Sequence, residues 1–280
     1  MKIGFIGQGW IGKHYADDFE NRGYDVVRYA LEEPYIKNRE EIKNCDIVFI
    51  AVPTPSTPEG FDSSILRDAI KNLGKGKIAV IKSTLLPGTT EEIQLENKDI
   101  FVVHSPEFLR EASAAFDASN PTRNIIGIPV DNDEYRERAN SVLSVLPESP
   151  FKMVCGSREA ELIKYGGNVH LYIKVVFMNM LHDLATSHNL DWDNIKNAMA
   201  ADPRIGSSHM DPVHQSGRGA GGHCFIKDFA AFKEQYEEAV GDSYGLAVLN
   251  ALQRKNNKLL KDSGKDLDLL RGVFGSIDNI

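Results

Sequence analysis

The stretch of sequence with the clearest chemical potential is Gly219–Asp228 (GAGGHCFIKD), in which a cysteine follows a run of glycines. A lone cysteine is most often a small buried apolar side chain. Here Cys224 precedes a Lys–Asp pair that ends at Asp228, so the pattern indicates an exposed polar setting that stabilises a thiolate. The sequence therefore favours a nucleophilic thiol at Cys224. Cys45 and Cys155 have no such surroundings, and we interpret them as structural.

A second glycine-rich segment, Gly7 to Gly12 (GQGWIG), follows an apolar run and opens a helical stretch. The GxGxxG pattern alone is weak, but a strand before it and a helix after it are the context of a dinucleotide site. Gly7 permits the turn, Gly9 lets the backbone approach a pyrophosphate, and Gly12 lets the helix pack closely. Trp10 and Ile11 complete the predicted cofactor loop, whose N–H groups face the phosphates. The alternative is a purely structural glycine turn.

The residues after the second predicted strand bear on the choice of dinucleotide. An acidic residue usually ends this strand and binds the ribose hydroxyls, but here Asp25–Tyr29 is followed by Ala30. Glu32 and Glu33 come just afterwards and take that role in our interpretation. Arg28 favours a 2′-phosphate, which the two glutamates oppose. We therefore expect NAD rather than NADP.

These segments require a scaffold, and the first half of the chain supplies a regular alternation of elements. Val- and Ile-rich runs predict buried parallel strands at Lys2–Ile6, Asp25–Tyr29, Asp46–Val52, Lys77–Ile81, Ile100–Val103 and Asn124–Ile128. Amphipathic stretches predict helices at Ile11–Arg22, Ser63–Leu73 and Glu134–Leu146. The alternation predicts an α/β fold, a Rossmann-like, doubly wound parallel sheet that forms an NAD-binding domain over residues 1–155.

The second half lacks strand signals and predicts a smaller all-helical domain over residues 156–280, which carries the cysteine loop. A long central helix is expected from Ser157 to about Ser187, and two more around Phe229–Val240 and Gly245–Lys261. The last dozen residues, including Phe274, show no clear pattern and are expected to be loose.

Composition narrows the class of protein. The formal net charge of −8 over 280 residues disfavours nucleic acid and anionic membranes as partners. Three widely spaced cysteines argue against a disulfide framework and favour a reducing compartment. No apolar run is long enough to span a bilayer, and the N-terminus has no signal peptide, so we expect a cytoplasmic protein. The histidines have no ligand spacing, and no metal is predicted.

Beyond the two glycine segments, the sequence resembles the UDP-glucose/GDP-mannose 6-dehydrogenase family of nucleotide-sugar dehydrogenases, and the UDP-glucose branch is the nearer. Between residues 3 and 228 the matching motifs occur in order: the glycine loop, Val52–Pro55 (VPTP), Lys82–Thr89 (KSTLLPGT), Ser105–Glu111 (SPEFLRE), Glu161–Tyr165 (ELIKY) with Asn168, Asp202–Gly206 (DPRIG) and the cysteine loop. Two departures occur in the last motif, where His223 replaces a usual serine and Ile226 a usual proline.

The resemblance implies a four-electron oxidation of a sugar C6 alcohol by NAD. The aldehyde is captured by Cys224 as a thiohemiacetal, oxidised to a thioester, and released by water as a uronic acid. Lys164 would steady oxyanion charge with Asn168 beside it on the same helix face. Thr84 and Asp228 would hold and activate the water, and Glu111 would assist hydrolysis.

The resemblance also implies binding residues around this chemistry. Cofactor contacts are expected from Pro53, Thr54, Thr84, Glu111 and Lys227, besides the glycine loop. Substrate contacts are expected from Glu107, Phe108, Leu109, Arg110, Lys164, Asn168 and Gly221.

Several of these residues have plainer interpretations when taken alone. Lys164 by itself is typical of a solvated helix lysine, and Asn168 of an amide on a helix face. Asp228 is also a common start signal for a helix. Glu111 is compatible with an ordinary surface carboxylate.

Family members usually continue with a third domain that closes over the nucleotide, whereas this sequence shows only helical residues after Cys224. Three hypotheses follow. The chain is a compact UDP-sugar 6-dehydrogenase that uses a partner subunit or a relaxed site, a dehydrogenase of a smaller hydroxy acid, or a non-catalytic dinucleotide-binding subunit. The polar residues of these motifs, present together, argue against the third hypothesis, because a protein that only binds a dinucleotide does not need them. The resemblance also implies a homodimer formed through the long helix.

Overall fold

The computed structural model describes residues 1–276. The chain forms two compact units. The first unit comprises Met1–Pro55 and Asp62–Lys164, and the second comprises Ser56–Phe61 and the chain from Tyr165 onward.

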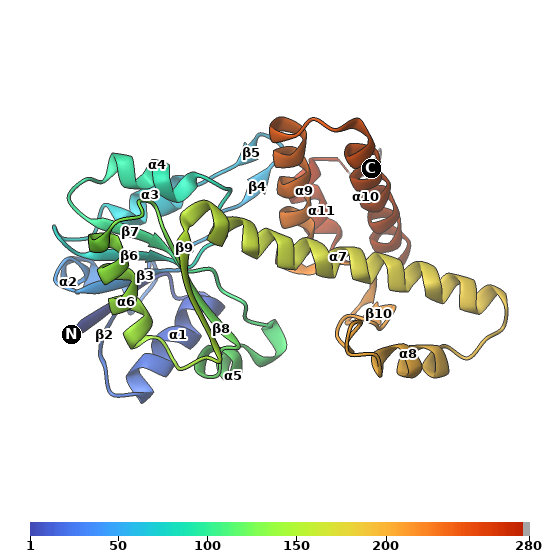
Figure 1. The fold of residues 1–280 in the computed structure, drawn as a ribbon, viewed down its shortest axis with the longest axis horizontal. Coiled ribbons are helices and arrows are strands. Elements are labelled where there is room, and N and C mark those ends of the chain that lie inside the picture. The colour runs from blue at the N-terminus through green and yellow to red at the C-terminus, as the bar shows by residue number, and fades with distance from the viewer. Residues whose placement is uncertain (277–280) are drawn as a thin grey trace. The chain divides into compact units, whose positions relative to one another are not determined.

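The first unit contains a seven-stranded sheet, visible in Figure 1, with the order β2-β1-β3-β6-β7-β8-β9. Its strands are β1 (Lys2–Ile6), β2 (Asp25–Tyr29), β3 (Ile47–Ile50), β6 (Ile78–Ile81), β7 (Phe101–His104), β8 (Arg123–Ile128) and β9 (Phe151–Gly156). All neighbours are parallel except β7 and β8, which are antiparallel. The Rossmann-like prediction is confirmed. The order reverses at β1, because β2 and β3 lie on either side of it, and a ligand crevice is expected at such a switch point.

Helices cover both faces of this sheet. One face packs against α1 (Trp10–Asn21), α5 (Ala114–Ser119) and α6 (Asp133–Val145) through alternate strand residues such as Phe5 and Phe49. The other face packs against α3 (Ser64–Ile70) and α4 (Thr89–Glu96) (Figure 1). The short helices η1 (Ile36–Asn38), α2 (Arg39–Ile42) and η2 (Glu111–Ser113) lie in the connections. Because both faces are covered, the strands consist of nearly continuous apolar residues.

Two features of the sheet differ from the prediction. Strand β9 was not predicted, because it ends the sheet and leaves Phe151 and Lys152 exposed, so it lacks the continuous apolar run of a buried strand. Strand β8 runs antiparallel to β7, which the apolar pattern alone does not reveal. As a result, β8 begins at the edge of the sheet where β7 ends.

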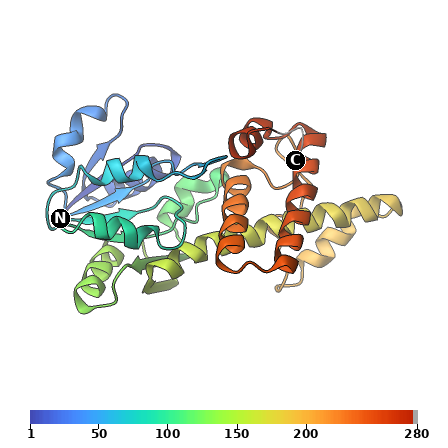
Figure 2. The same cartoon turned by 90° about the horizontal axis from the view of Figure 1, so that it is seen from above.

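The second unit is mainly helical. It contains α7 (Ser157–Ser187) from Tyr165 onward, α8 (Trp192–Ala200), α9 (Gly222–Ala239), α10 (Ser243–Ser263), α11 (Leu267–Phe274) and two hairpins, β4 (Ser56–Thr57) with β5 (Gly60–Phe61) and β10 (Val213–His214) with β11 (Gly217–Arg218). Figure 2 shows α9 and α10 side by side against α7. Tyr172 of α7 stacks on Phe229 of α9 with ring centres 3.9 Å apart. None of the described helices is long and apolar enough to cross a membrane.

Two expectations for the second unit need correction. Helix α9 begins at Gly222, seven residues before the predicted Phe229, so Cys224 lies in its first turn and Asp228 does not start it. The glycines hid this start because glycine is a poor helix former. Phe274 belongs to α11, which packs with Ile226 and Leu260. Residues 277–280 lie outside the described part of the chain.

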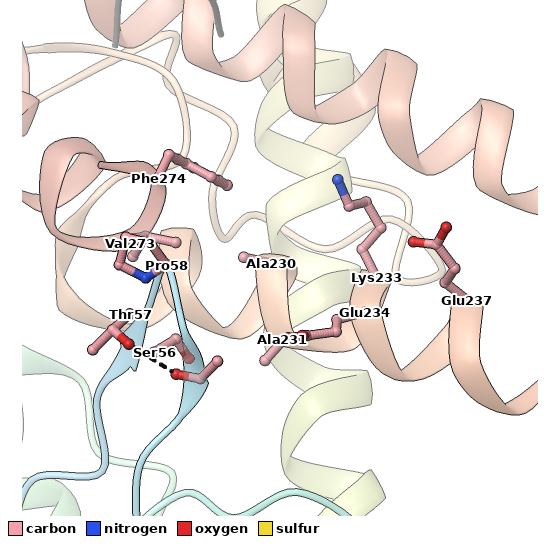
Figure 3. Close-up of a pocket in the computed structure, with 11 residues that line it drawn as sticks. Ser56, Thr57, Pro58, Ala230, Ala231, Lys233, Glu234, Glu237, Val273 and Phe274 are labelled. Atoms are coloured by element: carbon pink, nitrogen blue, oxygen red, sulfur yellow. Dashed lines mark hydrogen bonds between the residues drawn. The ribbon is translucent and has the colours of Figure 1, made fainter. Parts of the chain in front are cut away.

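The β4–β5 hairpin packs against α9 and α11, although its residues come from the first half of the sequence. Figure 3 shows a pocket between these elements. Its lining includes Pro58, Ala231, Lys233 and Phe274. It contains none of the predicted site residues.

Candidate active site

The glycine turn of the first unit has the geometry that a pyrophosphate requires. Gly7 has a φ of +89°, and a Cβ there would lie 2.3 Å from the Ala51 carbonyl oxygen. A Cβ on Gly12 would lie 2.0 Å from the carbonyl oxygen of Gly7. In contrast, among the described residues no heavy atom other than those of Gly9 and its two chain neighbours lies within 4 Å of the position of a Cβ on Gly9. The missing side chains of Gly7 and Gly12 thus allow α1 to pack closely against the strands, while the space next to Gly9 is open.

The start of α1 is available to an anion. Gly9 is its N-cap and supplies no side-chain hydrogen bond to the first turn. The N–H groups there are not used within the helix, and they carry its partial positive charge. Trp10 is exposed, and Ile11 is half-buried against the core. The loop therefore fits the diphosphate of a dinucleotide.

Arg28 does not offer its charge to a 2′-phosphate. Its guanidinium group pairs with Asp17 at 2.7 Å and with Glu20 at 2.7 Å, both on α1. An added phosphate would have to displace two carboxylates. This arrangement favours NAD over NADP and accounts for an arginine at this position.

Neighbouring loops at the carboxyl edge of the sheet carry other predicted cofactor residues. Pro53 and Thr54 follow β3, and Thr84 follows β6. The hydroxyl of Thr54 donates to the carbonyl oxygen of Thr84 at 2.8 Å, and that of Ser83 donates to the carbonyl oxygen of Val52 at 2.6 Å. These bonds tie the two loops together, so their positions are fixed relative to the sheet.

Lys164 lies buried in the first unit, which rules out the solvated lysine. Its Nζ donates to the Glu107 carbonyl oxygen at 2.7 Å and to Glu107 Oε1 at 2.9 Å. The other carboxylate oxygen of Glu107 accepts from the Leu109 N–H at 2.8 Å. The side chains of Lys164 and Glu107 are 5% and 3% exposed. A buried charge pair held by three hydrogen bonds is an oriented ammonium group suited to stabilising negative charge.

The rest of the Ser105–Glu111 motif is more open. Phe108 lies near two cations, with the Arg123 guanidinium 3.7 Å and Lys164 Nζ 5.7 Å from its ring centre. Arg110 is exposed and pairs with Asp117 at 2.6 Å. Glu111 is exposed at the start of η2. Sequence reasoning missed Arg123, whose place next to Phe108 follows from the antiparallel direction of β8.

Two basic side chains next to this motif, Lys82 and His104, are buried at the ends of neighbouring strands. Sequence reasoning also missed them. Lys82, directly after β6, donates to Ser105 Oγ at 3.1 Å and lies 4.4 Å from the Tyr15 ring centre. Burial lowers the pKa of Lys82 to about 7. Burial likewise lowers the pKa of His104 to about 3, so that imidazole is neutral. Lys82 is part of the Lys82–Thr89 motif, but nothing in that motif distinguished the lysine from its neighbours.

In the second unit, Cys224 is the third residue of α9, and Asp228 lies one turn further along. The buried Asp228 carboxylate accepts from Asn168 Nδ2 at 2.6 Å and from Lys227 Nζ at 2.6 Å. Each oxygen thus has its own donor, so the carboxylate is held in one orientation. Helix N-termini favour thiolates, which suits a nucleophile in this first turn.

The other two cysteines have different surroundings. Burial raises the pKa of Cys45 to about 11, and burial likewise raises that of Cys155 to about 11. Both thiols are therefore protonated at neutral pH, in keeping with a structural interpretation.

The predicted residues thus form two sets. The first unit holds the glycine loop, Thr84, Glu107–Glu111 and Lys164, and the second holds Asn168, Gly221, Cys224, Lys227 and Asp228. Lys164 and Asn168 share α7 but belong to different units, and the amide of Asn168 binds Asp228.

Comparison with known proteins assigns the chain to a family. Residues 33–144 match the NAD-binding domain, and residues 158–258 the central domain, of the UDP-glucose/GDP-mannose dehydrogenase family. UDP-glucose 6-dehydrogenase of Rickettsia bellii is 34% identical over 92% of this chain and 67% of its own length. The chain belongs to the UDP-glucose/GDP-mannose dehydrogenase family. This confirms the resemblance, and the match to the NAD-binding domain confirms NAD as the cofactor.

Solved structures agree at the level of the fold. A UDP-glucose dehydrogenase from Pyrobaculum islandicum superposes with a TM-score of 0.79 at 27% identity, covering 98% of this chain and 71% of that one. A 3-hydroxyisobutyrate dehydrogenase of Mycobacterium tuberculosis gives 0.72 at 15% identity, covering 99% and 97%. The second likeness shows the fold alone. The chain spans about two thirds of the length of several family relatives that it matches.

Proposed function

We propose that this member of the UDP-glucose/GDP-mannose dehydrogenase family oxidises the C6 alcohol of a UDP-sugar, as in the conversion of UDP-glucose to UDP-glucuronate. One observation carries the proposal: Cys224 lies in the first turn of α9, and Asp228, held by Asn168 and Lys227, lies one turn away. A thiol beside an oriented base suits covalent capture of an aldehyde. An enzyme that only converts an alcohol to a ketone needs no such capture.

The reaction proceeds in two oxidations and one hydrolysis. NAD, held at the glycine loop, would supply the hydride acceptor for both oxidations. In the first, the C6 alcohol loses a hydride and a proton and becomes an aldehyde. Cys224 Sγ then adds to the aldehyde carbon while a proton moves to the oxygen, which gives a thiohemiacetal. Loss of a second hydride and proton gives a thioester, and water then releases the uronic acid and the thiol. Each sugar consumes two NAD and one water.

The described contacts suggest a role for each polar group. The Lys164 ammonium, oriented by Glu107, would stabilise negative charge on the reacting oxygen. Asp228, whose two oxygens are fixed by Asn168 and Lys227, would accept a proton from the thiol or from water. Thr84 would help to hold that water.

The remaining residues would serve hydrolysis and binding. Glu111 would assist the hydrolysis. The exposed side chain of Arg110 and the half-buried Phe108 and Leu109 would contact the sugar nucleotide together with Gly221. The proposed reaction draws on residues of both units.

The decisive experiment counts NADH formed per UDP-glucose consumed by the purified chain. The proposal predicts two NADH per sugar, and at most one for Cys224→Ala. Cys155→Ala is the matched control, because it removes a half-buried thiol outside this set and should keep the ratio of two. Absence of turnover despite NAD binding would overturn a self-sufficient UDP-glucose enzyme. GDP-mannose and other nucleotide sugars would then be assayed.

A second candidate is a dehydrogenase of a small hydroxy acid. The fold is compatible with it, given the likeness to 3-hydroxyisobutyrate dehydrogenase. It predicts one NADH per molecule of a hydroxy acid such as 3-hydroxyisobutyrate and an unimpaired Cys224→Ala variant, so the same NADH count with that substrate separates the two functions.

We also propose a homodimer formed through α7. Ile173, Phe177, Met180 and Leu184 are exposed at spacings of four, three and four residues, so they form one apolar stripe. Phe177→Asp should convert a dimer to a monomer in sedimentation at micromolar concentration. Thr186→Asp, an exposed position away from the stripe, should leave the dimer intact. A monomeric parent protein would refute this proposal.

A further inference from the structure

The backbone of the loop before Cys224 is hydrogen-bonded by side chains that come late in the sequence of the second unit. Asn256 of α10 accepts from the Ala220 N–H at 2.7 Å and donates to the Ala220 carbonyl oxygen at 2.9 Å. Lys265 donates to the carbonyl oxygen of Gly219 at 3.2 Å. Asn256 and Lys265 are 1% and 3% exposed. These are buried polar contacts to the backbone of the loop, and such contacts are costly to leave unmade.

The next contact reaches the helix that carries the cysteine. Asp266 accepts from the N–H of Gly222, the first residue of α9, at 2.7 Å. That N–H is one of the donors that a helix cannot satisfy internally. A carboxylate there also complements the positive end of the helix. Asp266 therefore caps, from a distant segment, the turn in which Cys224 lies.

The glycines of the loop are explained by the same segment. A Cβ on Gly221 would lie 2.0 Å from Asp266 Oδ2 and 2.9 Å from Lys265 Cε. Gly219 has a φ of +94°, and a Cβ there would lie 3.1 Å from Asn256 Oδ1. These positions require glycine because side chains of the same chain occupy the space, independently of any substrate.

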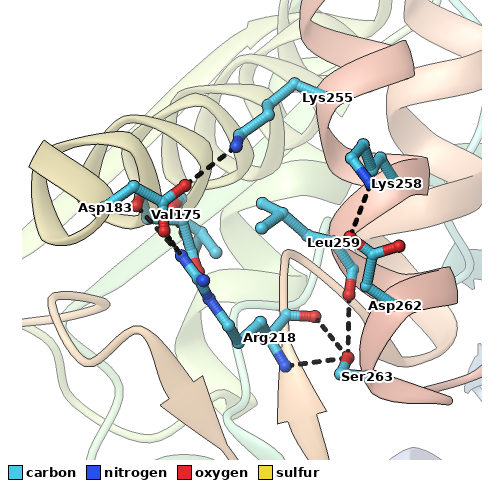
Figure 4. A network of polar contacts seen from close by, with 9 residues as sticks. Val175, Asp183, Arg218, Lys255, Lys258, Leu259, Asp262 and Ser263 are labelled. Atoms are coloured by element: carbon cyan, nitrogen blue, oxygen red, sulfur yellow. Dashed lines mark hydrogen bonds and ion pairs between the residues drawn. The ribbon is translucent and has the colours of Figure 1, made fainter. Parts of the chain in front are cut away.

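The entrance to the loop is anchored as well, as Figure 4 shows. The Arg218 N–H donates to Ser263 Oγ at 3.0 Å. The Arg218 guanidinium pairs with Asp183 of α7 at 2.6 Å, and Lys255 of α10 pairs with the same carboxylate at 3.0 Å. The backbone from Arg218 to Gly222 is thus held against α7, α10 and the turn after α10.

We propose that Asn256, Lys265 and Asp266 form a clamp that positions Cys224, and that they are positioning residues for its thiol chemistry. The inference rests on the proposed role of Cys224 as the nucleophile. A glycine-rich loop loses much conformational entropy on ordering, so it needs such contacts to stay in one conformation. The clamp supplies them from residues that follow the cysteine by about thirty to forty positions.

The test compares Asp266→Ala with Asp266→Asn, which keeps a hydrogen-bond acceptor. Asp268→Ala is the matched control, because that exposed acid lies two residues further along and pairs with Arg271, three residues away on the same helix. Two quantities are measured on the full chain without sugar. They are amide hydrogen exchange in a peptide spanning residues 217–226, and the rate at which iodoacetamide alkylates Cys224, followed by peptide mass.

Asp266→Ala should raise both the exchange rate and the alkylation rate by about tenfold, the effect expected for loss of a buried hydrogen bond in a loop that then opens locally. Asp266→Asn should restore both rates to near the parent values, and Asp268→Ala should change neither. Parent-like rates in Asp266→Ala would overturn the clamp. So would failure of Asp266→Asn to restore the rates. Both measurements are independent of sugar turnover, so a protein without dehydrogenase activity still tests the clamp.

A second pair of variants covers the case in which Asp266→Ala does not fold. Gly221→Ala alone should destabilise the chain, because its Cβ meets Asp266 and Lys265. Combined with Asp266→Asn it should remain destabilised, because the asparagine side chain occupies the same space as the aspartate. Equal melting temperatures for Gly221→Ala and the parent would overturn the steric part of the proposal.

Discussion

Lys82→Met gives a quantitative test of the electrostatics beneath the predicted site. The buried ammonium group of Lys82 has a hydroxyl and a ring as its close contacts, in Ser105 and Tyr15. Burial lowers its pKa from 10.5 to about 7, although the charge of Glu107 acts in the opposite direction. Between these two values the unfolded chain binds more protons than the folded chain. The free energy of unfolding must therefore rise with pH across this window.

The magnitude follows from the pKa shift. One pKa unit corresponds to about 1.36 kcal/mol, so protonation of Lys82 lowers stability at pH 7 by roughly 4 kcal/mol relative to pH above 10.5. Raising the pH from 7 to 9 recovers about 2 kcal/mol of the lost free energy of unfolding. Lys82→Met removes the titration and loses a hydrogen bond worth about 1 kcal/mol. The variant should therefore be more stable than the parent at pH 7, and its advantage should shrink by about 2 kcal/mol at pH 9.

The assay uses urea unfolding followed by tryptophan fluorescence. The sequence has two tryptophans, and Trp10 is the one in the first unit. A Trp192→Phe background therefore makes the signal specific to the unit that contains Lys82, which avoids treating two units as one transition. Lys71→Met, at an exposed position, is the control and should show a difference independent of pH. If the gap between Lys82→Met and its parent stays constant from pH 7 to pH 9, the reasoning is wrong.

Two further predictions concern the cofactor loop and the buried ion pair. Gly9→Ala should weaken NAD binding in calorimetry with little change in melting temperature, because its Cβ would meet none of the described residues beyond its chain neighbours. Gly12→Ala should lower the melting temperature as well, and equal melting temperatures for the two variants would contradict this. Lys164→Met should destabilise the first unit by about 3–5 kcal/mol in urea unfolding, because it leaves Glu107 buried and unpaired. Adding Glu107→Gln should recover part of that loss, and a second variant as unstable as the first would count against the pairing.

The sequence was most informative where local pattern determines structure. Strands β1 and β2 and the long helix α7 have the predicted bounds, because continuous apolar runs and a sustained helical period are properties of neighbouring residues. The glycine turn was predictable for the same reason. The positive φ of Gly7 and the close contact of Gly12 are set within a dozen residues.

The contacts that orient the chemical groups were not predictable. Lys164 meets Glu107 across 57 positions of sequence, and Asn168 meets Asp228 across 60. Both depend on how strands and helices pack, which a local pattern does not encode. Motif resemblance singled out these four residues, but it did not reveal that Asn168 and Lys227 both bind one carboxylate. The buried state of Lys82 had no sequence signal either.

The β4–β5 hairpin has a consequence for how this architecture can be divided. Because Ser56–Phe61 packs within the second unit, the chain passes between the units after Pro55, after Phe61 and after Lys164. Neither unit is therefore a single contiguous stretch of the chain. A fragment ending at Lys164 would contain the hairpin without α9 and α11, against which the hairpin packs. The complementary fragment would contain these helices without the hairpin. If the cofactor unit were exchanged between members of the family, the hairpin that comes with it would have to fit the α9 and α11 surface of the recipient.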